Sequence, residues 1–190
     1  MIDIRRRCAR WLPEHNDPVI RFATTHDLPV LQDIERAAGT PFAEIGMAMV
    51  AEDEPPSLET LRAFQRAGRA WVWTCADRPV GYLLIDVVDG NAHIDQVSVH
   101  PDHAGRRIGK HLIDHAVRWA TDAGMRAITL TTFTEVPWNG PYYERLGFRY
   151  LSVEEETPGL RAVRATEHAH GLDRWPRACM RAELVAWSMD

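Results

Sequence analysis

The chain has 190 residues, of which 45% are hydrophobic and 26% are charged, a composition typical of a soluble globular protein that can bury a core. The formal net charge of −5 at pH 7 argues against general nucleic-acid binding, because domains with that function are usually basic. We therefore expect no nucleic-acid partner.

The three cysteines, Cys8, Cys75 and Cys179, lie far apart and form no CxxC pair. This pattern favours a reducing compartment over a disulfide framework or a cysteine zinc site. His111 and His115 have the spacing of two metal ligands on one helix face, but no third ligand accompanies them, so we expect a solvated face and no metal site. The sequence shows no apolar stretch long enough for a signal peptide or a membrane span, which predicts a cytoplasmic protein with no membrane partner.

Hydrophobic periodicity predicts a polar N-terminal extension at 1–18 and one mixed α/β domain at 19–190. The expected order of elements is β-α-α-β-β-β-α-β-α-β-β. Strands are expected at 19–24, 69–76, 79–90, 91–100, 127–133, 148–153 and 178–187. Helices are expected at 28–37, 58–68, 107–123 and 140–147, with a further short helix or a loop at 40–50.

Local signals mark the ends of several elements. Ser57 is expected to cap the helix at 58–68, Asp89-Gly90 to form a hairpin turn, and Asp77-Arg78 to join the two preceding strands. The polar segment from 154 to 178 is expected to be a loop, and loops of this length are often either functional or disordered.

The segment Gly105–Lys110 carries two glycines and three cations where a strand passes into a helix. Amides in the first turn of a helix lack intrahelical partners and bind phosphate, and glycine lets a phosphate approach them closely. The spacing of Gly105 and Gly109 fits neither a P-loop nor a dinucleotide-binding fingerprint, so a nucleoside triphosphate is not expected. The segment indicates a site for another phosphate-bearing ligand or, alternatively, a helix start with solvated arginines.

Residues 99–110, Val-His-Pro-Asp-His-Ala-Gly-Arg-Arg-Ile-Gly-Lys, resemble the acyl-CoA-binding turn of the GNAT superfamily of N-acetyltransferases. The pattern of that superfamily is Gln/Arg-x-x-Gly-x-Gly/Ala at the start of a helix. Here Ala104 stands at the Gln/Arg position and Arg107 at the central glycine. Residues 142–148, Tyr-Tyr-Glu-Arg-Leu-Gly-Phe, are similar to the late helix of the superfamily. The resemblance, which covers residues 19–187, implies an α/β fold of the mixed, α+β-like kind, with a central, mostly antiparallel sheet flanked by helices.

The resemblance also implies that acetyl-CoA is the cosubstrate. Main-chain groups of the strand before the turn would contact the pantetheine arm, the Val97 amide would polarise the thioester carbonyl, and the turn would hold the pyrophosphate. The implied cofactor-binding residues are Val97, Ser98, Val99, Ala104, Gly105, Arg106, Arg107, Ile108, Gly109, Lys110 and Asn139. Asn139 is expected first of all as the N-cap of the helix that follows it.

Tyr143, in the late-helix motif, is the implied general acid, because a phenol with a reference pKa of about 10 is protonated at neutral pH and can donate to a leaving thiolate. His93 and Asp95 alternate onto one strand face with Val97 and Val99. The two residues together are the implied base: His93 has the better intrinsic pKa, and Asp95 would attract and orient a cation. The alternatives are ordinary packing for Tyr143 and a solvent-facing polar pair for His93 and Asp95.

The implied reaction is direct transfer of an acetyl group to a primary amine of a small molecule or peptide, and a homodimer is expected. Phe42, Glu44, Trp138 and Trp175 are candidates for acceptor contacts, and the segment 154–178 for acceptor specificity or a dimer contact. An alternative is a catalytically silent acyl-CoA-binding module that regulates a partner, and the departures at Ala104 and Arg107 keep this alternative open. A nucleotide-binding regulator is a further alternative, for which ATP binding is the test.

Overall fold

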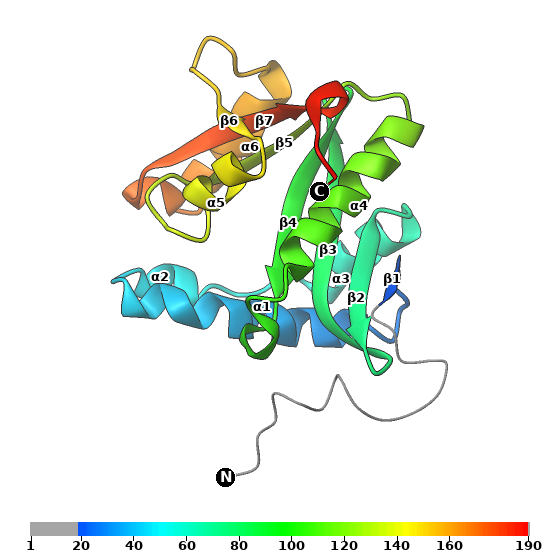
Figure 1. Ribbon diagram of the computed structural model, residues 1–190. Helices are drawn as coiled ribbons and strands as arrows, with labels where there is room; N and C mark the ends of the chain where they lie inside the picture. Colours follow the sequence, from blue (N-terminus) through cyan, green and yellow to red (C-terminus); the bar gives the residue numbers. More distant parts are fainter. Residues whose placement is uncertain (1–18, 190) are drawn as a thin grey trace. The chain divides into compact units, whose positions relative to one another are not determined.

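The structure, a computed structural model, describes residues 19–189, and Figure 1 shows its helices and strands. Within these residues the chain forms two compact units. The first unit contains residues 19–83 and 97–112, and the second contains residues 84–96 and 113–189. The extension expected at 1–18 lies outside the described residues, and the single domain expected at 19–190 stays a prediction.

The strands form a seven-stranded sheet in the order β1-β2-β3-β4-β5-β7-β6. Pairing is antiparallel between β1 and β2, β5 and β7, and β6 and β7, and parallel between β4 and β5. The strands are β1 (Val19–Phe22), β2 (Ala70–Cys75), β3 (Arg78–Val88), β4 (Asn91–Val99), β5 (Ala127–Phe133), β6 (Arg149–Tyr150) and β7 (Arg177–Glu183). The helices are α1 (Leu28–Glu44), α2 (Ala48–Ala51), α3 (Leu58–Arg66), α4 (Ile108–Asp122), α5 (Gly140–Arg145) and α6 (Pro158–Ala169), with short 3-10 turns η2 (Pro101–His103), η3 (Leu172–Arg174) and η4 (Leu184–Ala186). The expected fold class, a mixed α/β fold with a mostly antiparallel sheet, is confirmed.

Hydrogen bonds fix the start of α1 in the first unit. Asp27 accepts two hydrogen bonds from the Arg21 guanidinium (2.7 and 3.0 Å) and one from the Thr24 amide (2.7 Å). Burial alone raises the pKa of Asp27, but these bonds outweigh burial and lower the pKa to about 2. The side chains that α1 buries are Leu28, Leu31 and Ile34. The helix continues to Glu44 through Pro41, beyond the end expected at residue 37.

The expected caps and turns of the first unit are largely present. Ser57 Oγ accepts a hydrogen bond from the Thr60 amide (3.1 Å), so the predicted N-cap of α3 is confirmed. The turn between β2 and β3 lies one residue earlier than expected, at Ala76 and Asp77. Both residues have positive φ (50° and 61°), as a tight hairpin turn of the primed type requires.

The second unit is built around β5, which pairs with β4 on one side and with β7 on the other. Its hairpin turn at Asp89 (φ 49°) and Gly90 (φ 76°) is the one that the sequence predicts. Two strands are shorter than expected: β6 covers Arg149–Tyr150, and β7 ends at Glu183, where η4 follows instead of more strand.

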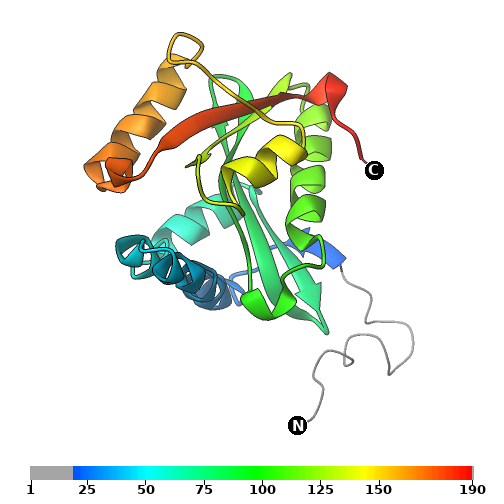
Figure 2. The same ribbon diagram turned by 60° about the vertical axis from the view of Figure 1, so that its left-hand side comes forward.

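The segment expected to be a loop at 154–178 contains the helix α6, so that prediction is wrong. Thr157 Oγ1 caps the helix by accepting a hydrogen bond from the Leu160 amide (3.4 Å). Leu160 is its one buried residue, so the segment lacks the apolar stripe by which a helix is recognised in a sequence. Figure 2 shows α6 beside β7, and the ion pair of Glu167 with Arg177 joins the two elements.

The first residues of α6 rest on the turn between β3 and β4. The Gly159 amide donates a hydrogen bond to Asp89 Oδ2 (2.8 Å). A Cβ on Gly159 would lie 2.6 Å from both Asp89 Oδ2 and Val88 Cγ1, so only glycine fits there without a shift of its neighbours. Across residues 19–189, no helix combines the length and the apolar character needed to cross a bilayer.

Candidate functional site

The end of β4 is anchored through the buried side chain of Ser98. Ser98 Oγ donates a hydrogen bond to Glu35 Oε2 of α1 (2.7 Å), and the Tyr82 hydroxyl of β3 donates to the same oxygen (2.5 Å). Because side chains alternate along a strand, Val97 and Val99 face the opposite side, where both are partly exposed. Glu35 therefore ties α1 to β3 and to the part of β4 that is expected to bind the cofactor.

The turn that follows η2 has an unusual backbone. Gly105 (φ 75°) and Arg107 (φ 58°) both have left-handed conformations, and residues 104–107 are exposed. No atom lies within 4 Å of a Cβ placed on Gly105. Arg107 thus adopts the conformation that glycine favours, at the position where the resemblance expects glycine.

The helix α4 begins directly after this turn. The His111 amide donates to the Arg107 carbonyl oxygen (3.0 Å), which closes the first helical turn. The amides of Ile108, Gly109 and Lys110 belong to that turn, where a helix has no internal acceptors and carries partial positive charge. An exposed glycine, a helix N-terminus and cationic side chains in one place fit a phosphate group. Across the described part of the chain, no three His, Cys, Asp or Glu side chains gather in a way that fits a metal ion.

Two packing contacts hold the start of α4 against the strands. A Cβ on Gly81 of β3 would lie 3.1 Å from the Ser98 carbonyl oxygen and 3.2 Å from Ile108 Cγ2, so glycine allows a close approach here. The His111 ring stacks on the Trp73 ring, with 5.2 Å between centroids and 19° between planes. His111 is exposed, as a solvated helix face requires, and its ring also contacts an aromatic side chain.

In the second unit, His93 of β4 is buried, with 3% of its surface exposed. Its Nδ1 lies 2.9 Å from Thr129 Oγ1, which donates its own proton to the Ala92 carbonyl oxygen (3.2 Å). We therefore assign the proton of the neutral imidazole to Nδ1, which leaves the lone pair on Nε2. Burial lowers the pKa of His93 to about 4, against an opposing effect of Glu167 and Asp86, so the ring is neutral at pH 7. Asp95, two residues further on the same strand face, is exposed.

Tyr143 of α5 is the second candidate catalytic group of this unit. Its ring packs edge-on against Tyr142 (5.5 Å between centroids) and Phe148 (5.7 Å). Burial, and to a smaller extent Tyr142, raises the pKa of Tyr143, while the charge of Arg177 opposes that shift. The phenol is therefore protonated at neutral pH and able to donate a proton.

Asn139 occupies the N-cap position of α5, as expected, but its side chain makes no capping hydrogen bond. Its Nδ2 instead donates to Thr132 Oγ1 of β5 (3.2 Å). The Asn139 carbonyl oxygen accepts hydrogen bonds from the Tyr142 and Tyr143 amides (2.8 and 3.0 Å). Asn139 thus joins the start of α5 to β5 and orients the helix that carries Tyr143.

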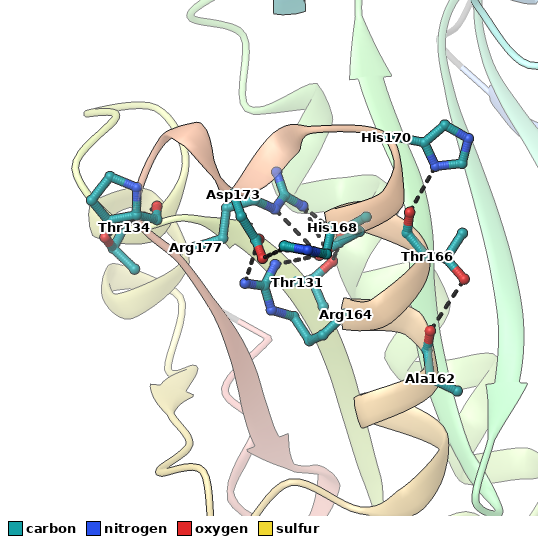
Figure 3. Close-up of polar contacts among 11 residues, drawn as sticks. Thr131, Thr134, Ala162, Arg164, Thr166, His168, His170, Asp173 and Arg177 are labelled. Atoms are coloured by element: carbon teal, nitrogen blue, oxygen red, sulfur yellow. Dashed lines mark hydrogen bonds and ion pairs between the residues drawn. The ribbon is translucent and has the colours of Figure 1, made fainter.

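A group of polar side chains, the arginine–carboxylate cluster, connects α6 and η3 to β5 and β7, and Figure 3 shows it. Glu167 Oε1 accepts from Arg177 Nη2 (2.7 Å), and Glu167 Oε2 accepts from Arg164 Nη1 (2.6 Å). Arg164 Nη2 also donates to Asp173 (2.8 Å), and Thr131 donates to Glu167. Burial raises the pKa of Glu167, but the bonds and charge of the arginines outweigh it, and the pKa is lowered overall. The members of the cluster are Thr131, Arg164, Glu167, Asp173 and Arg177.

Comparison with known protein families identifies the family to which the chain belongs. The family described as the acetyltransferase (GNAT) family matches residues 29–148, more than half of the sequence. The chain belongs to the GNAT family. The match includes β4, the glycine turn, the start of α4 and the segment around Tyr143.

Solved structures share the fold of this GNAT chain at low sequence identity. N-acetylglutamate synthase from Neisseria gonorrhoeae, complexed with coenzyme A and N-acetyl-glutamate, aligns with a TM-score of 0.66 and 16% identity over 90% of the chain and 36% of that protein. The PaiA N-acetyltransferase from Thermoplasma acidophilum, in complex with coenzyme A, aligns with a TM-score of 0.66 and 14% identity over 88% and 99%. The ribosomal-protein-S18-alanine N-acetyltransferase from Escherichia coli aligns with a TM-score of 0.64 and 18% identity over 91% and 97%.

The predicted site residues of the GNAT chain fall in both units. Residues 97–99 and 104–110 lie in the first unit, whereas His93, Asp95, Asn139 and Tyr143 lie in the second. Their roles in binding and catalysis stay predictions. The sequence did not reveal Glu35 as the partner of Ser98 or Thr129 as the partner of His93, because each contact joins segments far apart in the chain. The close packing of β3 at Gly81 could have been predicted from the sequence, since a glycine inside a strand often marks a place where another backbone segment approaches closely.

Proposed function

We propose that this GNAT chain is an acetyl-CoA-dependent N-acetyltransferase that transfers an acetyl group directly to a primary amine of a small molecule or peptide. The observation that carries the proposal is the left-handed, exposed turn at Gly105 and Arg107, which leads directly into the N-terminus of α4. Such a turn suits a pyrophosphate, and coenzyme A is bound in two of the structures with the same fold.

Acetyl-CoA supplies an acetyl group activated as a thioester. The Val97–Val99 segment of β4, held by the bonds of Ser98 and Tyr82 to Glu35, would accept the pantetheine arm along its main chain, as an added strand. Arg106, Arg107 and Lys110 add positive charge next to the first-turn amides of α4, where the pyrophosphate would lie.

The side chains of the second unit supply the proton transfers. His93 Nε2 accepts the proton that the amine gives up as the carbon–nitrogen bond forms, and exposed Asp95 attracts the cationic amine. Tyr143 donates its phenolic proton to the sulfur as the carbon–sulfur bond breaks, since the raised pKa of Tyr143 keeps the phenol protonated. A cationic amine first releases one proton to solvent, and the neutral amine then gives a second proton to His93 while Tyr143 protonates the sulfur. The proton on His93 replaces the one lost by Tyr143 through solvent, so one proton is released overall and the reaction is balanced.

The first test is calorimetric titration of the purified protein with acetyl-CoA, with ATP as the control ligand. We expect micromolar binding of acetyl-CoA alone, followed by release of coenzyme A in a screen of primary amines. The variant Gly105→Ala is expected to weaken binding, because a Cβ at this left-handed position distorts the turn. Gly124→Ala is a matched control, because Gly124 has the same conformation (φ 73°) and open surroundings at the other end of α4. Equal affinities in the two variants would contradict the role of the turn.

One observation favours the catalytically silent acyl-CoA-binding module as a second candidate. Burial lowers the pKa of His93 to about 4, which makes its imidazole a weak base at pH 7. Binding of acetyl-CoA without turnover of any primary amine would select this module over the enzyme.

A further inference from the structure

Arg177 of β7 is held more rigidly than a surface arginine. Its Nη2 and Nε donate to the two carboxylate oxygens of Glu167 (2.7 and 3.3 Å). Its guanidinium lies over the Phe133 ring, 4.3 Å from the centroid, and only 9% of its side chain is exposed. These contacts fix the direction in which the guanidinium can donate further hydrogen bonds.

One edge of this guanidinium remains available. Nε and Nη2 make the bonds to Glu167, and Nη2 also lies 3.4 Å from Thr131 Oγ1. Within residues 19–189, Nη1 has no protein acceptor at hydrogen-bond distance. Its two N–H groups are therefore oriented in advance for an oxygen that does not belong to the described chain, and binding that oxygen costs little side-chain entropy.

The available edge belongs to the same sheet face as the candidate base. His93 Nδ1 contacts Thr129, and Arg177 Nη2 contacts Thr131. Thr129 and Thr131 are two residues apart on β5, so they share a face and lie about 6.6 Å apart at about 3.3 Å per residue. A ligand that forms one hydrogen bond with His93 and another with Arg177 must therefore carry two polar groups only a few bonds apart.

This face of the sheet carries proton acceptors on β4 and a hydrogen-bond donor on β7. His93 and Asp95 of β4 accept protons or attract cations, whereas Arg177 offers N–H donors and positive charge. A molecule that suits both sides has an amine for β4 and an oxygen for Arg177. A polyamine presents only N–H donors, and the Arg177 guanidinium, which is also a donor, has no acceptor to offer a second ammonium group.

We propose that Arg177 determines acceptor specificity by donating from Nη1 to an oxygen of the carbonyl or carboxylate group attached to the carbon that bears the reacting amine, so that the preferred acceptors are α-aminoacyl compounds. The inference rests on the proposed acetyl transfer. The oxygen can come from the carboxylate of a free amino acid or from the carbonyl of an aminoacyl amide, and the experiment separates the two sources.

The test measures kcat and KM for four acceptors: alaninamide, alanine, isopropylamine and putrescine. Isopropylamine carries a methyl group in place of the carboxamide or carboxylate. The wild type is expected to prefer alaninamide or alanine to the two oxygen-free amines by about tenfold or more in kcat/KM, as for other charge-assisted hydrogen bonds. Arg177→Lys is expected to raise KM for the preferred acceptor to a similar extent, with little change for isopropylamine. The higher activity of alanine or of alaninamide identifies the source of the oxygen.

Arg164→Lys is the matched control, because Arg164 also pairs with Glu167 but lies on α6 and contacts Asp173 rather than Phe133. It is expected to lower the melting temperature about as much as Arg177→Lys and to keep the acceptor preference. A wild type that acetylates isopropylamine or putrescine as well as alaninamide overturns the inference, and so does an Arg177→Lys variant with unchanged preference.

A second experiment distinguishes failure of the proposed acetyl transfer from failure of acceptor recognition. It measures, by calorimetry, binding of the same four amines to the protein saturated with coenzyme A. If no amine is turned over, binding of alaninamide or alanine to the wild type but not to Arg177→Lys still supports the recognition site. Turnover that is independent of Arg177 keeps the acetyltransferase and overturns the inference. Absence of both turnover and binding overturns both proposals.

Discussion

Gly81 lies at a point in β3 where an added side chain would be crowded. A Cβ there would lie 3.1 Å from the Ser98 carbonyl oxygen, 3.2 Å from Ile108 Cγ2 and 3.3 Å from Val99 Cγ2. The oxygen belongs to the main chain and cannot rotate away, so in Gly81→Ala the strand must shift against β4 and the first residue of α4. Overpacking of this kind costs about 1–3 kcal/mol. For a chain of this size, the melting temperature is then expected to fall by about 2–12 °C.

Scanning calorimetry of Gly81→Ala and a control, Gly39→Ala, measures this cost. Gly39 lies inside α1, where the nearest atom to an added Cβ is the Ala51 carbonyl oxygen at 3.4 Å, an ordinary contact. Alanine favours the helix there, so the control is expected to be about 0.4–1 kcal/mol more stable than the wild type.

The same variants test the link between packing and ligand binding. Gly81 contacts the end of β4 and the start of α4, so Gly81→Ala is expected to weaken acetyl-CoA binding in a titration, while Gly39→Ala leaves it unchanged. If Gly81→Ala melts at the wild-type temperature, the packing argument is wrong. If it is destabilised but binds acetyl-CoA normally, the coupling of β3 to the turn is wrong.

Three further substitutions test individual residues. Burial lowers the pKa of His93 from 6.5 to about 4, so between these two pH values the unfolded chain binds a proton that the folded chain does not. Acidification from pH 7.5 to 5 is therefore expected to lower the free energy of unfolding, measured in urea, by about 2 kcal/mol. An equal loss in His93→Gln would show that this histidine is not the cause. Tyr143→Phe is expected to lower kcat about tenfold or more with an unchanged acetyl-CoA Kd, whereas weaker binding with normal turnover would make Tyr143 a binding residue. Arg107→Gly is expected to raise the free energy of unfolding by up to about 1 kcal/mol in urea, because it removes a Cβ from a left-handed position, and a loss of stability would show that the turn is unstrained.

The sequence predicted those parts of the fold whose signals are local. Ser57 caps α3, Asp89 and Gly90 form the hairpin turn, and Gly105 precedes α4, because each feature depends on a few adjacent residues. The alternation of apolar residues located the strands, although β6 and β7 are shorter than their apolar runs.

The parts that the sequence did not predict depend on contacts that a pattern of apolar residues does not show. Arg164 and Glu167 pair with Asp173 and Arg177, and these ion pairs rather than an apolar stripe hold α6 in place. The burial of His93 was missed for the same reason, since alternation shows which residues share a face but not what covers it. Its contact with Thr129, 36 residues later, exists only once β4 and β5 are paired.

The contact between Gly159 and Asp89 predicts how these two positions vary among homologous sequences. The two residues are 70 positions apart, yet the amide of one donates to the carboxylate of the other, and a larger residue at 159 would collide with the hairpin. Homologues that carry a helix at this place are expected to conserve glycine at 159 together with a hydrogen-bond acceptor at 89. Homologues with a short connection between β6 and β7 have no such constraint, so the two positions are expected to covary when diverged sequences are aligned.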